Sequence, residues 1–315
     1  MLTISNKGKL MPESPIRKLV PYAERAKKKG VRVFHLNIGQ PDIETPPSAM
    51  DAVRNSDIKV LAYSKSEGDF ELRNKISDYY SKINIHIDES QVIVTSGASE
   101  ALLFTIGSIM DPDDEVIIPE PFYANYNGFS AANGVNIVPI FSSIENNFEL
   151  PKIQEFERLI TPKTKAILIC NPNNPTGYVY SHNEIKTLVD IVKKHNLFLI
   201  ADEVYREFTY DNTSHTSILK FNEINENAII IDSVSKRYSM CGARIGCIIS
   251  KNKEFISTAM KFAQARLSPP TLAQIASVAA MDTGNDYFDS VIEEYNNRRK
   301  TLIEGLSEIP GVIVS

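Results

Sequence analysis

A lysine with a distinctive set of neighbours follows a late apolar run of the chain. Lys236 comes three residues after Ser233 and eight residues before Arg244. A hydroxyl and a guanidinium both donate hydrogen bonds to anionic oxygens, so Ser233 and Arg244 could bind a phosphate. A lysine beside a cation has a lowered pKa, which makes its neutral amine available as a nucleophile near neutral pH. This combination predicts a Schiff-base lysine next to an anion cradle.

A second anion-binding element is expected where an earlier apolar run ends. Gly97, Ala98 and Ser99 open a segment with a helical pattern, and the free N–H groups at a helix N-terminus suit a phosphate. The ordinary alternative is a serine that caps a helix at a turn between a strand and a helix. The phosphate interpretation therefore depends on the other groups that meet this turn.

Three further segments carry groups that could hold an aromatic ring. Tyr123 follows an apolar run, Asn174 lies in the turn NPNNPTG (171–177), and Asp202 and Tyr205 follow another apolar run. Each has an ordinary alternative: core packing for Tyr123, a rigid turn for 171–177, and a helix cap for Asp202. A carboxylate at the end of a buried strand is costly without a cation, so Asp202 predicts a positively charged partner.

Pyridoxal 5′-phosphate is a cofactor that would use these groups together. Its phosphate needs an anion cradle, its aldehyde condenses with a lysine, and its cationic ring nitrogen needs a carboxylate. The ring oxygen would accept hydrogen bonds from Asn174 and Tyr205. The residues expected to bind this cofactor are Gly97, Ala98, Ser99, Asn174, Asp202, Tyr205, Ser233, Lys236 and Arg244.

Strands that alternate with helices must position these residues. The segment 181–195 has the pattern of an amphipathic helix, with Ser181 and Glu184 as a capping box. Strands that are apolar throughout indicate an α/β fold whose mostly parallel sheet is sandwiched between helices and binds ligands at the carboxyl ends of its strands. The segments predicted as strands are 91–97, 114–119, 135–140, 165–170, 197–202, 228–233 and 245–250.

Composition excludes several classes of function. The chain has 315 residues, a formal net charge of -5 and no long block of like charge, which argues against binding to nucleic acid. It has no signal-like or membrane-spanning apolar segment. The three cysteines have no paired C-x-x-C spacing, so neither a disulfide framework nor a metal site is expected, and a reducing cytoplasm fits best.

The order and spelling of the motifs resemble those of class I and II aminotransferases of the aspartate aminotransferase superfamily, which have fold type I. The resemblance covers most of the chain. It rests on LNIGQPD (36–42), YSKSEGDFELR (63–73), TSGASEAL (95–102), PEPFYANY (119–126), NPNNPTG (171–177), DEVY (202–205) and SVSKRYSMCGARIG (233–246).

This resemblance implies an amino transfer from an L-amino acid to a 2-oxo acid, with Lys236 as the catalytic residue. It further implies that Tyr123 stacks on the cofactor ring, and that Gly39 and Asn174 lie on the substrate side. Tyr63 matches a tyrosine that reaches the phosphate of a neighbouring subunit, which implies a homodimer with shared active sites. The same motifs occur in β-lyases, and an aminotransferase-like sensor without catalysis is a further alternative.

The resemblance also implies a division into domains. Residues 46–290 would form the large cofactor-binding domain, and 1–45, with a helix around 14–29, would contribute to a smaller α+β domain. Residues 291–315 would begin the C-terminal part of that small domain, with the apolar run 311–315 as its first strand. In the family, the arginine for the substrate α-carboxylate lies beyond this point, so no arginine of the chain is assigned to it.

Overall fold

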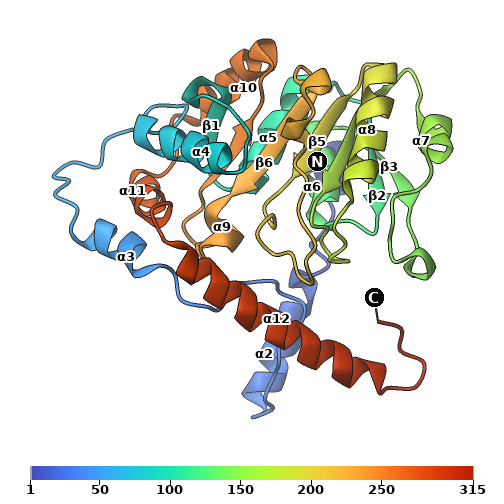
Figure 1. Cartoon of the computed structure of the whole chain (residues 1–315), viewed down its shortest axis with the longest axis horizontal. Helices are drawn as coiled ribbons and strands as arrows, with labels where there is room; N and C mark the ends of the chain where they lie inside the picture. Colours follow the sequence, from blue (N-terminus) through green and yellow to red (C-terminus); the bar gives the residue numbers. More distant parts are fainter. Residues whose placement is uncertain (1, 315) are drawn as a thin grey trace.

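The computed structural model describes residues 2–314, and a seven-stranded sheet forms its centre (Figure 1). The strand order is β1-β7-β6-β5-β4-β2-β3, and β7 runs antiparallel to both of its neighbours while the other six of these strands point the same way. The mostly parallel sheet is therefore confirmed. Its strands are β1 Val92–Thr95, β2 Glu115–Glu120, β3 Asn136–Phe141, β4 Thr164–Cys170, β5 Phe198–Asp202, β6 Ala228–Ser233 and β7 Gly246–Ile249.

The helices lie on both faces of the sheet and beside it (Figure 1). The capping box predicted for α8 is present, because Ser181 Oγ accepts from Glu184 N at 3.3 Å and Glu184 Oε2 accepts from Ser181 N at 2.7 Å. The helices are α1 Asn6–Leu10, α2 Val20–Lys28, α3 Pro47–Arg54, α4 Phe70–Lys82, α5 Ala98–Ile109, α6 Asn125–Asn133, α7 Ile153–Leu159, α8 His182–His195, α9 Val234–Arg237, α10 Lys253–Arg266, α11 Thr271–Ala280 and α12 Asn285–Ser307.

Each face of the sheet packs into its own apolar core. Side chains alternate between the two faces along a strand, so Leu199 and Ile230 join the core covered by α4 and α8. Ile200 and Ile231 point the other way, into the core covered by α5 and α10. Helices on both faces explain why every residue of β6 is buried. The same alternation sends polar groups at the strand ends to opposite faces.

The strand ends that carry the candidate residues meet at one edge of the sheet. β2, β4, β5 and β6 run parallel, and β7 is antiparallel to both β6 and β1, so β1 points the same way as β6. The segments after these five strands therefore converge at one edge. Ligands bind at such an edge in open α/β sheets.

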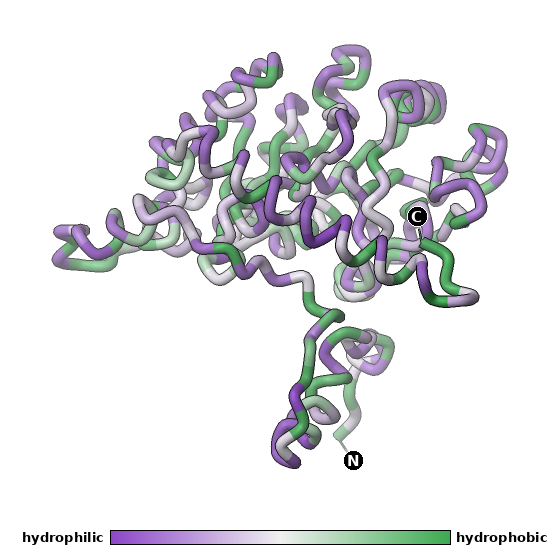
Figure 2. The backbone as a smooth tube through the Cα atoms, turned by 60° about the horizontal axis from the view of Figure 1, so that its bottom comes forward, coloured by the Kyte–Doolittle hydropathy of each residue, from purple (hydrophilic) through white to green (hydrophobic). Residues whose placement is uncertain are grey.

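The terminal segments lie outside this sheet. Figure 2 shows the N-terminus at the end of a segment that projects from the rest of the chain, and neither α1 nor α2 has a buried residue. The helix predicted around 14–29 is found as a 3-10 turn, Arg17–Leu19, followed by α2. No helix within residues 2–314 is long and apolar enough to cross a membrane.

The proposed division of the chain into domains stays a prediction, and α12 runs without a break through its boundary at residue 290. The strand predicted at 311–315 is part of that division and likewise stays a prediction; in the structure, residues 312–314 are not a strand. They pair with no other strand in the part of the chain that the structure describes, and Ile313 is 72% exposed. An apolar run becomes a strand only where a second strand supplies hydrogen-bond partners.

Candidate active site

Lys236 lies on α9, a single helical turn that follows β6 directly (Figure 1). Ser233 caps this turn, since its Oγ accepts from Ser235 N at 3.0 Å. The Lys236 Nζ donates to the Gly39 carbonyl oxygen at 2.6 Å and lies 5.7 Å from the centre of the Tyr205 ring. The structure therefore brings together the lysine, one predicted cofactor-binding tyrosine and the glycine expected on the substrate side.

The pKa of Lys236 is lowered, as the sequence predicts, but the main cause differs. Burial lowers the pKa most, and the Arg244 guanidinium lowers it further, while the charges of Cys241 and Asp202 raise it. A desolvated ammonium loses its proton more easily than one in water. The surroundings of Lys236 therefore favour the neutral amine that a nucleophile or general base requires.

Asp202 ends β5 as a buried carboxylate without a cation. Its Oδ2 accepts from Tyr126 Oη at 2.9 Å, and its Oδ1 accepts from Val204 N at 3.4 Å. Burial raises the pKa of Asp202 to about 6, although both hydrogen bonds lower it. Among residues 2–314, no Lys, Arg or His lies within 4.0 Å of its oxygens. The positive partner predicted for Asp202 is thus not supplied by the described side chains.

Asn174 and Tyr205 lie side by side at the same edge, with Asn174 Nδ2 donating to Tyr205 Oη at 3.2 Å. Asn171 and Asn173 of the same turn serve the fold instead. Asn171 binds the backbone of Tyr180 at 3.0 Å, and the amide of Asn173 reaches the carbonyl of Pro121 at 3.2 Å. Only Asn174 of these three points its amide toward the tyrosine.

The N-terminus of α5 forms an open corner next to Arg244. Gly97 precedes the helix with φ 82°, and no side chain of the described residues caps it. A Cβ added to Gly97 would lie 2.2 Å from Arg244 Nη2, and a Cβ on Gly246 would lie 2.6 Å from Ala98 N. Both glycines are therefore needed for the close approach of the guanidinium and β7 to the helix N-terminus, where Ser99 lies in the first turn.

The hydroxyl of Ser233 lies close to that of Ser235. The two Oγ atoms are 2.7 Å apart, and Ser233 Oγ is also 2.7 Å from the carbonyl oxygen of Ile245. Arg244 Nη1 donates to the carbonyl oxygen of Cys241 at 2.9 Å. Ser235 and Cys241, which are not among the residues predicted to bind the cofactor, therefore lie beside two that are, Ser233 and Arg244.

Two aromatic residues of the site differ in how far the sequence reveals them. Tyr123 is partly buried and meets Tyr126 edge-on, with ring centres 5.5 Å apart. Tyr126 was missed, although it lies in the quoted motif PEPFYANY (119–126); Tyr123 precedes α6 and Tyr126 lies in its first turn. Tyr63 is 79% exposed, and no hydrogen bond or ring contact among the described residues joins it to Lys236 or Asp202. Its assignment to a neighbouring subunit stays a prediction.

These residues fit pyridoxal phosphate by the chemistry of the groups they present. Asp202 is a buried carboxylate that lacks a cation, which matches a protonated ring nitrogen. Arg244 and the uncapped start of α5 match a phosphate. The described residues contain no group of three or more His, Cys, Asp or Glu side chains that could hold a metal ion.

Comparisons with known proteins agree with this chemistry. The family described as aminotransferase class I and II matches residues 31–315. An aspartate aminotransferase of Thermotoga maritima is 36% identical over 309 residues, covering 94% of this chain and 79% of that protein. An alanine aminotransferase from Pyrococcus furiosus has a TM-score of 0.91 and 30% identity over 98% of this chain and 80% of its own.

A solved aspartate aminotransferase from Thermus thermophilus, with maleate, also has a TM-score of 0.91, with 29% identity over 98% of this chain and 81% of its own. The fold is thus that of the fold type I pyridoxal-phosphate enzymes. The chain belongs to the class I and II aminotransferases, and it is a pyridoxal-phosphate-dependent aminotransferase. Nothing in these comparisons favours the β-lyase alternative.

Proposed function

We propose that Lys236 is the residue that attaches the cofactor and moves the reacting proton. The observation that carries this proposal is the pairing of a buried lysine of lowered pKa with a buried carboxylate, Asp202, that has no cation of its own. When bound, pyridoxal phosphate supplies an electron sink for charge that develops at the substrate Cα. Lys236 Nζ, as a neutral amine, would take the proton from that carbon as a general base.

The neighbouring residues have separate roles in this proposal. Asp202 holds the ring nitrogen in its protonated form, and Tyr126 orients Asp202 through its hydroxyl. Asn174 and Tyr205, which are hydrogen-bonded to each other, would bind the ring oxygen, and Tyr123 would pack against the ring. The phosphate is held by Ser233, Arg244 and the first turn of α5, namely Gly97, Ala98 and Ser99. The backbone of Gly39, whose carbonyl accepts from Lys236 Nζ, and the amide of Asn174 would contact the substrate.

An acidic amino acid, aspartate, is the amino donor that we propose, with a 2-oxo acid as acceptor. Two of the relatives are named as aspartate aminotransferases. A further positive charge acts on the site: burial raises the pKa of Tyr123, and the charges of Arg244 and Arg17 oppose that rise. Arg17 is exposed and makes no salt bridge within residues 2–314. It could therefore receive the second carboxylate of such a donor.

A panel of amino donors with 2-oxoglutarate tests this assignment. The proposal predicts that aspartate gives a higher kcat/KM than alanine, and that Arg17→Gln lowers kcat/KM for aspartate by about tenfold while leaving alanine nearly unchanged. Equal loss for both donors would contradict the role of Arg17. Preference for alanine in the unmodified protein would contradict aspartate as the donor. Activity toward neither donor would contradict both as substrates, and borohydride trapping of pyridoxal phosphate on Lys236 would then test the role of that lysine separately.

The assembly that we propose is a homodimer in the cytoplasm with shared active sites. Val60, Leu61 and Tyr63 are 76%, 63% and 79% exposed on the loop between α3 and α4. Contiguous exposed apolar groups of this kind are typical of protein interfaces. Three free cysteines in the described chain suit a reducing compartment. Light scattering of the purified protein would give the mass of the assembly directly.

A further inference from the structure

A buried ionic cluster lies on the face of the sheet opposite Asp202 and Tyr126. It consists of Glu203, Arg206 and Glu207, which follow β5, together with Asp232 near the end of β6 and Arg237 on α9. Four of the five are at most 6% exposed; Glu207 lies at the margin of the cluster. Charged side chains are almost never buried to this degree unless they are paired, so their arrangement is specific.

This cluster is joined to the candidate active site through the backbone at three points. Glu203 directly follows Asp202, Asp232 directly precedes Ser233, and Arg237 directly follows Lys236. Side-chain alternation explains the separation, because Asp232 contacts Tyr80 of one core while Asp202 contacts Tyr126 of the other. The ionic cluster and the Asp202 side of the candidate active site therefore share the ends of β5 and β6, but they lie on opposite faces of the sheet.

Arg237 is the residue that anchors α9 in this cluster. Its Nη2 donates to both carboxylate oxygens of Asp232, at 2.8 and 3.0 Å, and its Nε donates to Glu207 Oε1 at 2.7 Å. The guanidinium also lies 4.1 Å from the centre of the Tyr79 ring on α4. A planar guanidinium with three such partners has little freedom to move.

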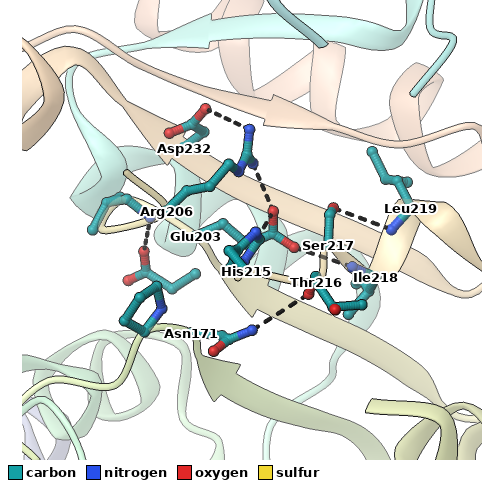
Figure 3. Close-up of polar contacts among 12 residues, drawn as sticks. Asn171, Glu203, Arg206, His215, Thr216, Ser217, Ile218, Leu219 and Asp232 are labelled. Atoms are coloured by element: carbon teal, nitrogen blue, oxygen red, sulfur yellow. Dashed lines mark hydrogen bonds and ion pairs between the residues drawn. The ribbon is translucent and has the colours of Figure 1, made fainter. Parts of the chain in front are cut away.

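A second arginine completes the set of contacts. Figure 3 shows Arg206 between Glu203 and Asp232. Arg206 Nη2 lies 2.6 Å from Glu203 Oε2 and Nη1 lies 4.0 Å from Asp232 Oδ2. Burial lowers the pKa of the adjoining His215 to about 3, so this histidine adds no positive charge. Burial raises the pKa of Asp232, but Arg237 and Arg206 together hold it below its usual value.

Stability is a weak explanation for such a cluster. Removing charges from water costs several kcal/mol per ion, and apolar residues of similar size often stabilise a fold as well or better. The helix that Arg237 ends, by contrast, needs an anchor. α9 has four residues, far fewer than an isolated helix requires, so tertiary contacts must fix its orientation.

We propose that Arg237 is a positioning residue for Lys236, and that its ion pair with Asp232 fixes the turn from which Lys236 projects. This inference rests on the proposed role of Lys236. Ser233 holds the start of α9 through the Ile245 carbonyl, and Arg237 holds its end, so Lys236 stands on a turn fixed on both sides. Adjacent residues of a helix project about 100° apart, which lets one enter the cluster while the other faces the cofactor groups.

The test follows the attachment of pyridoxal phosphate to Lys236 over time. Samples are trapped with borohydride, and the Lys236 peptide is quantified by mass at a temperature well below the Tm of every variant. Arg237→Lys keeps the positive charge but loses the planar guanidinium that donates to Asp232 and Glu207 at once, and Arg237→Met removes both the charge and these donors. A misplacement of 1 Å can cost about a hundredfold in rate, so we expect Arg237→Lys to slow attachment by about tenfold or more, and Arg237→Met to slow it further if it folds.

Ser181→Ala provides the control for stability, because it removes the cap of α8 and touches neither α9 nor the cluster. The inference predicts attachment at the wild-type rate in this variant. For Arg237→Lys it also predicts a lower kcat for transamination, with the KM for the amino donor nearly unchanged.

Wild-type attachment rates in Arg237→Lys would overturn the positioning role alone, and so would equal slowing in Ser181→Ala. If the wild-type protein itself is not labelled at Lys236, the proposed function fails first, and the positioning role fails with it. The two failures are thus told apart by the unmodified protein.

Discussion

Tyr126 donates its phenolic hydrogen to Oδ2 of Asp202 at 2.9 Å, inside the core covered by α5 and α10. Within residues 2–314, the Asp202 carboxylate accepts one further hydrogen bond, a long one from Val204 N at 3.4 Å. The phenol therefore orients the carboxylate that is proposed to hold the cofactor ring.

Tyr126→Phe should lower kcat by about tenfold, because a hydrogen bond to a charged group contributes roughly 1.5–3 kcal/mol. Tyr123→Phe removes the same atom from a ring three residues away, where the hydroxyl accepts from Asn125 Nδ2 at 2.7 Å and does not contact Asp202. That variant should keep most of the activity. Steady-state kinetics of the two variants decide the point, and a similar loss in both would argue against a specific role for Tyr126.

The raised pKa of Asp202 predicts a pH dependence of stability in the cofactor-free protein. Its folded-state pKa of about 6 lies above the ordinary value of 3.8, so its favourable contribution is complete below pH 3.8 and is lost as the pH rises through about 6. The difference corresponds to about 3 kcal/mol.

Asp202→Asn should remove this dependence. The free energy of unfolding of wild type minus that of Asp202→Asn should fall by about 2.4 kcal/mol between pH 4 and pH 7.5. Urea titrations of the cofactor-free proteins at several pH values measure it. A difference that stays constant with pH would show that Asp202 is not the buried acid described here.

Gly97→Ala should weaken the binding of pyridoxal phosphate by more than about tenfold, since the new methyl group would occupy the space of the Arg244 guanidinium. Gly30→Ala is a matched control: Gly30 has a φ of 78°, close to the 82° of Gly97, but open space around it. Spectroscopic titration with the cofactor compares them. Equal affinity in both variants would mean that the approach of Arg244 to α5 has no part in binding.

Shared active sites predict complementation between two damaged chains. Lys236→Ala and Tyr63→Phe should each have low activity, while a refolded mixture should regain up to about a quarter of wild-type activity in mixed dimers that keep one intact site. Activity of the mixture is compared with that of each variant alone. No gain on mixing, with mixed dimers present by mass, would place Tyr63 outside the partner site.

Much of the fold follows directly from the sequence. The apolar runs that predict the seven strands agree with the observed strands to within two residues at each end. Ser181 predicts the start of α8, because a capping box is a local pattern. The antiparallel direction of β7 could not be predicted, since strand direction depends on how the chain returns after α9 and not on local composition.

The site was less completely predictable. Lys236, Asn174, Tyr205 and Arg244 follow from strand ends and motif order. The buried ionic cluster was missed because Arg237 and Glu203 resemble ordinary surface charges in a sequence, and only the sheet shows that they face an interior. The cause of the lowered pKa of Lys236 depends on burial, which no local pattern reveals.

The most direct test of the proposed function is the identity of the residue that carries the cofactor. The protein is incubated with pyridoxal phosphate, reduced with borohydride and digested, and the modified peptide is identified by mass. We predict one modified lysine, Lys236, and no specific labelling in Lys236→Ala, whose transamination should also be lost. Stoichiometric labelling of another lysine, or substantial transamination by Lys236→Ala, would contradict the proposed function.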